Sequence, residues 1–126
     1  MSLSVDIDEP KKGTRRVTLS GTLDTETSPL LQRHLDGIVD SGVRKVVLDL
    51  ANLEYISSAG LGVLFWTKKA MDAKQGSLLM VNLQPQVRKV FEIVKAIPTM
   101  AVFRDYQELD DYLDYMQKHS GSDLNS

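Results

Sequence analysis

Segments with the two-residue period of a strand alternate along this chain with segments that have the helical period of about 3.6 residues. Two strand-like segments come first, at residues 3–8 and 15–20, with a polar turn between them. Helical and strand-like segments then follow one another to residue 118. Strands separated by helices form parallel sheets with right-handed crossovers, whereas a short polar turn favours an antiparallel hairpin. The sequence therefore predicts an α/β fold with a mixed sheet.

The bounds of the later elements follow from their apolar periods and from the residues at their ends. Pro29 is preorganised for a first helical turn, and Gly42 is a natural stop for the same helix. The next strand is almost continuously apolar, as expected for a central strand covered on both faces, and a short turn leads from it into the second helix. We expect strands at residues 45–50, 77–81 and 101–103, and helices at about 58–74, from 85 to before Pro98, and at about 106–118.

Length and charge limit the class of protein. The chain has 126 residues, with 15 Lys and Arg against 17 Asp and Glu, and hence a formal net charge of −2. Such a length fits one domain, which we place at residues 1–118, followed by a flexible polar tail at residues 119–126. A near-neutral balance argues against direct, non-specific binding of nucleic acid.

Cysteine is absent from the sequence, which excludes disulfides, thiolate metal sites and cysteine nucleophiles. The N-terminal residues do not form a signal peptide, and no apolar stretch approaches the roughly 20 residues of a membrane span. The sequence thus predicts a cytoplasmic protein.

Motifs for catalysis and for cofactors are also absent. The chain contains no Gly-x-Ser-x-Gly elbow, no Walker loop and no His-Glu-x-x-His motif. A small serine hydrolase is disfavoured because neither His34 nor His119 belongs to a triad motif. A group of acidic residues fits the polar face and the start of a helix better than a cation site; these are Asp105, Glu108, Asp110, Asp111 and Asp114. We expect no metal, no cofactor and no enzymatic activity.

The most informative segment is Ile-Ser-Ser-Ala-Gly-Leu-Gly-Val-Leu at residues 56–64. A serine at a helix start accepts a hydrogen bond from an unpaired amide, which explains one of Ser57 and Ser58. The glycines are not explained in this way, since glycine in a helix costs up to about 1 kcal/mol relative to alanine. Gly60 lies on the same arc of the helix as Val63 and Leu64, so we expect it to make a close contact with the sheet.

The opposite arc of this helix carries charged residues, and we expect it to face solvent. Leu61 and Phe65 fall on the same arc, beside Ser58 and Gly62. Apolar side chains next to a hydroxyl and a bare backbone are typical of a docking patch. Two ordinary exposed apolar side chains would explain the pattern equally well. The residues alone leave both interpretations open.

Three blocks of the sequence carry a family resemblance. They are Val-Thr-Leu-Ser-Gly-Thr-Leu-Asp at residues 17–24, Val-Leu-Asp-Leu at 47–50 with the segment 56–64, and Leu-Met-Val-Asn at 79–82 with residues 87–91. Over about residues 3–116 the chain resembles the STAS domain family, and specifically the stand-alone anti-sigma factor antagonists of bacteria. The middle block is the specific one. The resemblance implies a mixed sheet of four to five strands with helices packed mainly on one face.

Partner switching is the function that the resemblance implies. In this family the unphosphorylated antagonist binds an anti-sigma factor that is also a serine kinase, and so releases the sigma factor. The kinase inactivates the antagonist by phosphorylating a serine at the start of the second helix, and a serine phosphatase resets it. Ser58 matches that serine, and Asp24 matches an acidic residue placed close to it. Because Ser57 and Ala59 replace an aspartate and a second hydroxyl of many members, Ser57 remains the alternative phosphorylation site.

The resemblance and the helical arc together give a predicted partner surface, made of Asp24, Ser57, Ser58, Leu61, Gly62 and Phe65. The alternative function is that of a STAS subunit without phosphorylation, in a lipid-transport complex or a signalling scaffold. The sequence leaves open whether the chain is a monomer or a weak dimer.

Overall fold

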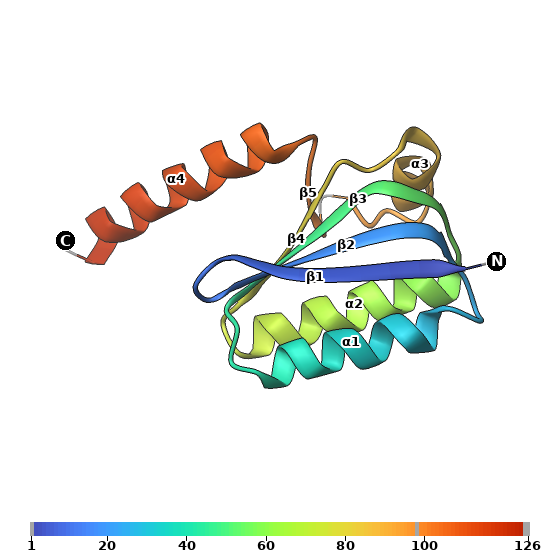
Figure 1. The fold of residues 1–126 in the computed structure, drawn as a ribbon. Helices are drawn as coiled ribbons and strands as arrows, with labels where there is room; N and C mark the ends of the chain where they lie inside the picture. The colour runs from blue at the N-terminus through green and yellow to red at the C-terminus, as the bar shows by residue number, and fades with distance from the viewer. Residues whose placement is uncertain (1, 98, 125–126) are drawn as a thin grey trace.

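Five strands form one mixed sheet in the computed structural model, which describes residues 2–97 and 99–124. Across the sheet they keep their sequence order (Figure 1): β1 (Leu3–Lys11), β2 (Thr14–Leu23), β3 (Lys45–Ile56), β4 (Ser77–Val81) and β5 (Ala101–Phe103). β1 and β2 are antiparallel, and the pairs from β2 to β5 are parallel. The predicted α/β fold with a mixed sheet is confirmed.

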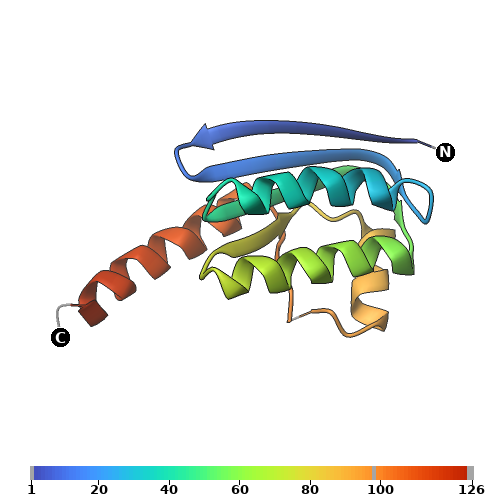
Figure 2. The same ribbon diagram turned by 90° about the horizontal axis from the view of Figure 1, so that it is seen from below.

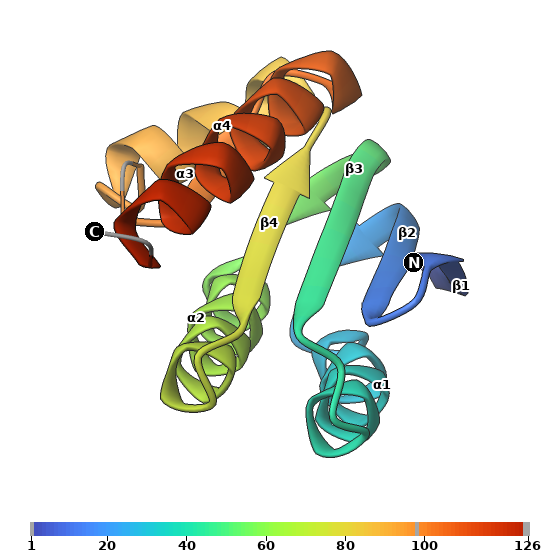
Figure 3. The same cartoon turned by 90° about the vertical axis from the view of Figure 1, so that its left-hand side faces the viewer.

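The described residues also form four helices: α1 (Ser28–Asp40), α2 (Ser58–Ala73), α3 (Pro85–Ile93) and α4 (Tyr106–Leu124). α1 and α2 lie side by side under one face of the sheet (Figure 2), and Val87 and Phe91 of α3 join the same main core. α4 lies away from α1 and α2 (Figure 3) and packs on the opposite face, over a small second core of Val47, Leu79, Val81 and Leu109. The helices therefore pack mainly on one face, as predicted.

The alternation of side chains along β3 explains this arrangement. Val46, Leu48 and Leu50 point into the main core, and Val47 points into the second core. Both faces of the strand are apolar because helices cover both of them.

In the described part of the chain, no helix combines the length and apolar character that a membrane crossing requires.

β3 is longer than the sequence predicted, since it continues past Leu50 to Ile56. Its second half pairs with the long strand β2 on one side. On the other side, two glutamines at the start of α3 donate hydrogen bonds to its carbonyl groups. The side-chain amides of Gln84 and Gln86 donate to the carbonyls of Ala51 and Glu54, at 2.7 and 3.2 Å. Polar residues in this half of β3 remain exposed and interrupt the apolar pattern, which is why the prediction ended the strand too early.

Two helix ends also differ from the prediction. The third helix was expected to continue to just before Pro98, but α3 ends at Ile93, and the next residue, Val94, is 48% exposed. α4 continues beyond Lys118 to Leu124, so the predicted end of the last helix is wrong. Glycine and serine in this stretch lower the helical propensity of the sequence, but they do not stop the helix. Residues 125–126 of the predicted tail lie outside the described residues.

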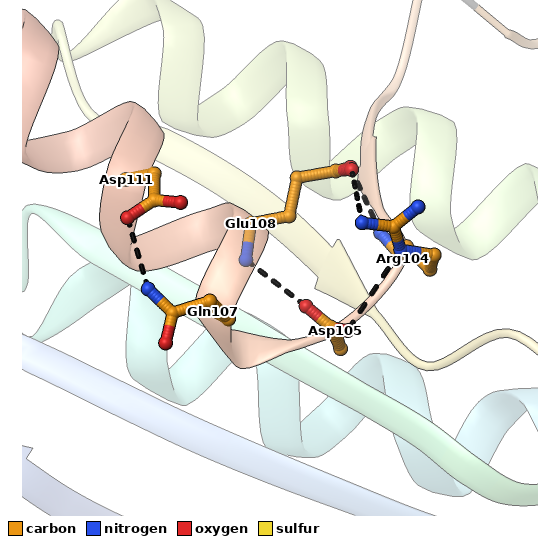
Figure 4. A network of polar contacts seen from close by, with 5 residues as sticks. All are labelled: Arg104, Asp105, Gln107, Glu108 and Asp111. Carbon is orange, nitrogen blue, oxygen red and sulfur yellow. Dashed lines mark hydrogen bonds and ion pairs between the residues drawn. The ribbon is translucent and has the colours of Figure 1, made fainter.

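The start of α4 is held by a reciprocal pair of carboxylates (Figure 4). Asp105 accepts a hydrogen bond from the amide of Glu108, and Glu108 accepts one from the amide of Arg104, both at 3.0 Å. The first hydrogen bond satisfies an amide that the first helical turn leaves unpaired, and the second ties the residues just before the helix to that turn. Asp105 therefore lies at the helix start, as predicted.

Among the described residues, no group of His, Asp and Glu side chains is arranged to hold a metal ion.

Tyr106 fixes α4 to the sheet. Its hydroxyl donates to Asp49 of β3 at 2.8 Å, and the guanidinium of Arg16 lies 6.0 Å from its ring centroid. Asp49 also accepts a hydrogen bond from the side-chain amide of Asn82 at 3.3 Å. Burial and the hydrogen bond to Asp49 raise the pKa of Tyr106 to about 12.

Replacing Tyr106 by phenylalanine should lower the free energy of unfolding by about 1 kcal/mol, the typical net contribution of one hydrogen bond. Because the pKa of Tyr106 is higher in the folded than in the unfolded chain, this contribution is complete below pH 10 and is lost as the pH rises toward 12. Urea unfolding at pH 8 and pH 11 measures both effects. Tyr112→Phe is the control, because Tyr112 forms no hydrogen bond through its hydroxyl within the described residues. A Tyr106→Phe variant as stable as the control at pH 8 would show that the hydrogen bond from Tyr106 to Asp49 does not stabilise the fold.

Candidate functional site

The carboxyl ends of β2 and β3 lie side by side, and α2 begins where β3 ends. Leu23 pairs with Ile56 across the two strands, and the amide of Ser57 donates to the carbonyl of Leu23 at 2.9 Å. Because the strands are parallel, the segments that follow them leave the sheet at the same edge. Asp24 and the start of α2 are thereby brought to one edge of the sheet.

Ser57 is the cap of α2. Its backbone is extended, its hydroxyl accepts from the amide of Gly60 at 3.3 Å, and its carbonyl accepts from the amide of Leu61 at 2.9 Å. Ser58 is the first helical residue and is exposed, and its hydroxyl forms no hydrogen bond within the described residues. The structure therefore assigns the capping role to Ser57 and leaves the hydroxyl of Ser58 facing solvent.

Asp24 holds the turn that leads into α1. Its carboxylate accepts hydrogen bonds from the amides of Glu26 and Thr27, both at 3.0 Å. The hydrogen bond from the Thr27 amide is the largest cause that lowers the pKa of Asp24 below its ordinary value. Asp24 is therefore negatively charged at neutral pH. The charge lies at the same edge of the sheet as Ser58, although no hydrogen bond joins the two side chains in the described structure.

Gly60 and Gly62 lie in different surroundings. A Cβ atom on Gly60 would come within 2.7 Å of Leu23 Cγ and 3.0 Å of Ile56 Cγ1, so the predicted close contact with the sheet is confirmed. A Cβ atom on Gly62 would meet no atom within 4 Å, and the residue is exposed. Packing inside this chain explains the first glycine and does not explain the second.

Leu61 does not lie on the exposed arc where the helical pattern placed it. The side chain is only 5% exposed and belongs to the main core, so this prediction is wrong. The physical reason is that α2 packs against α1 as well as against the sheet. A helix covered from two directions buries a wider arc than a helix covered by a sheet alone. Phe65, by contrast, is 38% exposed, as predicted.

Trp66 is a candidate that the sequence analysis missed. It follows Phe65 directly and is 56% exposed, the more exposed of the two aromatic side chains. On the helical pattern it falls between the buried and the exposed arcs, and the period alone cannot assign such a position. The available signal was a second large aromatic residue directly after Phe65, at the border of the predicted exposed arc. We refer to the exposed residues Ser58, Gly62, Phe65 and Trp66 as the docking face.

His34, one of the two histidines considered for a serine hydrolase, is not part of this site. His34 lies on α1, half-buried, and forms no hydrogen bond within the described residues. The side chain of His119 lies outside the described residues.

Comparison with protein families and with individual relatives gives consistent results. A family model described as the STAS domain matches residues 8–109. The "Putative anti-sigma factor antagonist BtrV" of Bordetella bronchiseptica is 45% identical over 75 residues, which are 60% of this chain and 65% of that protein. An anti-sigma F factor antagonist of Paenibacillus polymyxa is 28% identical over 104 residues, 82% of this chain and 88% of that protein. The chain thus spans slightly less than two thirds of the first of these relatives.

Two solved structures show the same fold. The unphosphorylated anti-sigma factor antagonist SpoIIAA has a TM-score of 0.75 and 20% identity, covering 88% of this chain and 97% of that one. An anti-sigma factor antagonist from Mycobacterium paratuberculosis has a TM-score of 0.78 and 24% identity, covering 92% of this chain and 95% of that one. At this level of identity the likeness concerns the fold.

Substituting each glycine by alanine should change stability in opposite directions. Gly60→Ala forces a methyl group against Leu23 and Ile56 and should cost about 1–3 kcal/mol of unfolding free energy. Gly62→Ala adds a methyl group in open space and should stabilise α2 by up to about 1 kcal/mol. Urea unfolding of the two variants and the wild type measures the difference. A Gly60→Ala variant as stable as the wild type would contradict the claim that the contact with Leu23 and Ile56 leaves no room for a side chain.

Proposed function

The chain belongs to the STAS domain family, and from this premise we propose that it is an anti-sigma factor antagonist that acts by partner switching. Its relatives carry that name, both over a shorter match at 45% identity and over most of the chain at 28% identity. We further propose that its partner is an anti-sigma factor with serine kinase activity. Binding of the unphosphorylated chain to this partner releases the sigma factor.

The observation that carries the proposal is the difference between the two serines at the start of α2. The hydroxyl of Ser57 is engaged with the amide of Gly60, whereas that of Ser58 is exposed and unengaged. A kinase needs an accessible hydroxyl, so Ser58 is the phosphorylation site in this proposal. A serine phosphatase then restores the binding-competent form.

A phosphate on Ser58 is compatible with the fold. The N-terminus of a helix has unpaired amides and a positive dipole end, both of which favour an anion. Phosphorylation adds a charge of about −1.5 to −2 at neutral pH. The helix start can therefore carry the phosphate without rearrangement, and the effect of phosphorylation falls on the partner.

The same phosphate opposes docking. It would lie on a surface that includes Phe65 and Trp66, where burial against a partner would remove its water. It would also add to the negative charge of Asp24 at the same edge of the sheet. Desolvation and like-charge repulsion act in the same direction. We propose that the switch works through these local effects, with little change of fold.

The rest of the docking face suits a protein partner. Gly62 presents bare backbone, so a partner can approach α2 closely at this position. Phe65 and Trp66 offer two exposed aromatic side chains next to it. Aromatic residues of this kind often supply most of the binding energy of an interface.

Charging the docking face should weaken binding to the kinase without unfolding the chain. Phe65→Glu should lower the affinity at least ten-fold, because it places a carboxylate where an aromatic ring is buried on binding. The free energy of unfolding should change by no more than about 1 kcal/mol, since Phe65 is partly exposed. Ile93→Glu is the matched control on α3, where the side chain is 69% exposed. Calorimetric titration with the cognate kinase should find the control within two-fold of the wild type; equal affinities for both variants would reject the docking face.

Substitutions of the two serines should separate binding from capping. Ser58→Ala should bind the kinase like the wild type and remain unmodified. Ser58→Asp should bind at least ten-fold more weakly and keep a native circular dichroism spectrum. Ser57→Ala removes the cap and should cost about 1 kcal/mol of stability, but should leave binding intact. If Ser58→Asp binds as tightly as the wild type, the switch is wrong, and the scaffold or lipid-transport subunit becomes the better account.

A further inference from the structure

A cavity of about 280 Å³ lies on the face of the sheet opposite to α1 and α2. It lies between α4 and the part of the sheet near the β1–β2 turn. Figures 1 and 3 show this turn at the end of the sheet beyond which α4 projects. The lining of the cavity contains cations of the strands and apolar side chains of β3 and α4. It shares no residue with the docking face.

The polar side of the cavity is a row of residues on three adjacent strands. Lys11 of β1 pairs with Thr14 of β2, and Thr14 pairs with Lys45 of β3. Adjacent strands are about 4.8 Å apart, so the two lysines stand about 10 Å apart with the threonine between them. Their long side chains can both reach one anion above Thr14. We call these three residues the lysine row.

The ammonium groups of the lysine row form no ion pairs within the described residues. Neither Lys11 nor Lys45 takes part in a side-chain hydrogen bond there. Arg16, a third cation of the lining, is already held by the carboxylate of Asp8, with its Nε at 2.9 Å from the nearer oxygen. One carboxylate, that of Asp110, also lies in this lining. Two free ammonium groups at one cavity favour an anionic ligand.

The other side of the cavity is apolar. Val47 of β3 and Leu109 of α4, both members of the second core, line it together with the half-buried Leu113 of α4. A wider groove continues from the cavity along α4 and reaches Asp114 and Met116. It shares Lys11, Lys45, Asp110 and Leu113 with the cavity. An inorganic anion would leave this apolar wall in water, whereas an apolar body attached to the anion would cover it.

We propose that this cavity binds a small soluble organic anion, of the class of aromatic or acyl carboxylates and sulfonates. The lysine row holds the anionic head, with the hydroxyl of Thr14 as a further donor. Val47, Leu109 and Leu113 contact the apolar body. The volume lies near the lower end of the range for ligand pockets, which selects a ligand of one or two rings or a short acyl chain.

The first test is an NMR titration of the full chain with naphthalene-1-sulfonate. Saturable shifts of the amides of Thr14, Lys45, Val47, Leu109 and Leu113 are expected, with the docking face unaffected. Inorganic sulfate should bind at least ten-fold more weakly, because it has no apolar body. Shifts confined to other parts of the chain, or equal affinity for sulfate, would overturn the proposal.

The second test uses a variant with Lys11→Gln and Lys45→Gln together. It should bind naphthalene-1-sulfonate at least ten-fold more weakly, and the ligand should no longer raise its melting temperature. Lys12→Gln is the matched control, since Lys12 is exposed in the same turn and does not line the cavity; its affinity should stay within two-fold. Unchanged affinity of the double variant would overturn the proposal. So would binding to phosphatidylglycerol vesicles without binding to the soluble sulfonate, because the site would then recognise an anionic membrane surface.

Discussion

The contact of Gly60 with Leu23 and Ile56 determines how the rest of the site is built. With no side chain on Gly60, the start of α2 packs directly on the last residues of β2 and β3. The helix must then begin immediately after β3, with Ser57 as its cap and Ser58 as its first residue. Since Gly60 faces the sheet, the helical period turns Ser58, Gly62 and Phe65 away from it. One close backbone contact thus sets both the helix start and the direction of the docking face.

The two faces of the sheet separate two kinds of surface. One face carries the main core under α1 and α2, and the docking face lies on the outer surface of α2. The other face is covered only in part, by α4, which Tyr106 fixes to Asp49. The uncovered remainder contains the lysine row and its cavity. The proposed sites for a protein partner and for a small anion share no residue.

Local signals made much of this structure predictable. The order of the elements followed from periods of apolar residues, and the close contact of Gly60 followed from an unexplained glycine on a buried arc. Features that depend on a neighbour in space were not predictable. Leu61 is buried because α1 packs beside α2, and β3 continues to Ile56 because β2 and two glutamines satisfy its backbone. The cavity required the pairing of Lys45 with Thr14, and through it with Lys11, which are both far from Lys45 in the sequence.

The central claim is that the hydroxyl of Ser58, set free because Ser57 caps the helix, is the switch of this protein. Mapping the modified residue tests it most directly. The chain is incubated with its cognate kinase and ATP, digested, and analysed by mass spectrometry that resolves the two adjacent serines. The account predicts a single phosphate, on Ser58. A phosphate on Ser57, or none on a chain that still binds the kinase, would contradict it.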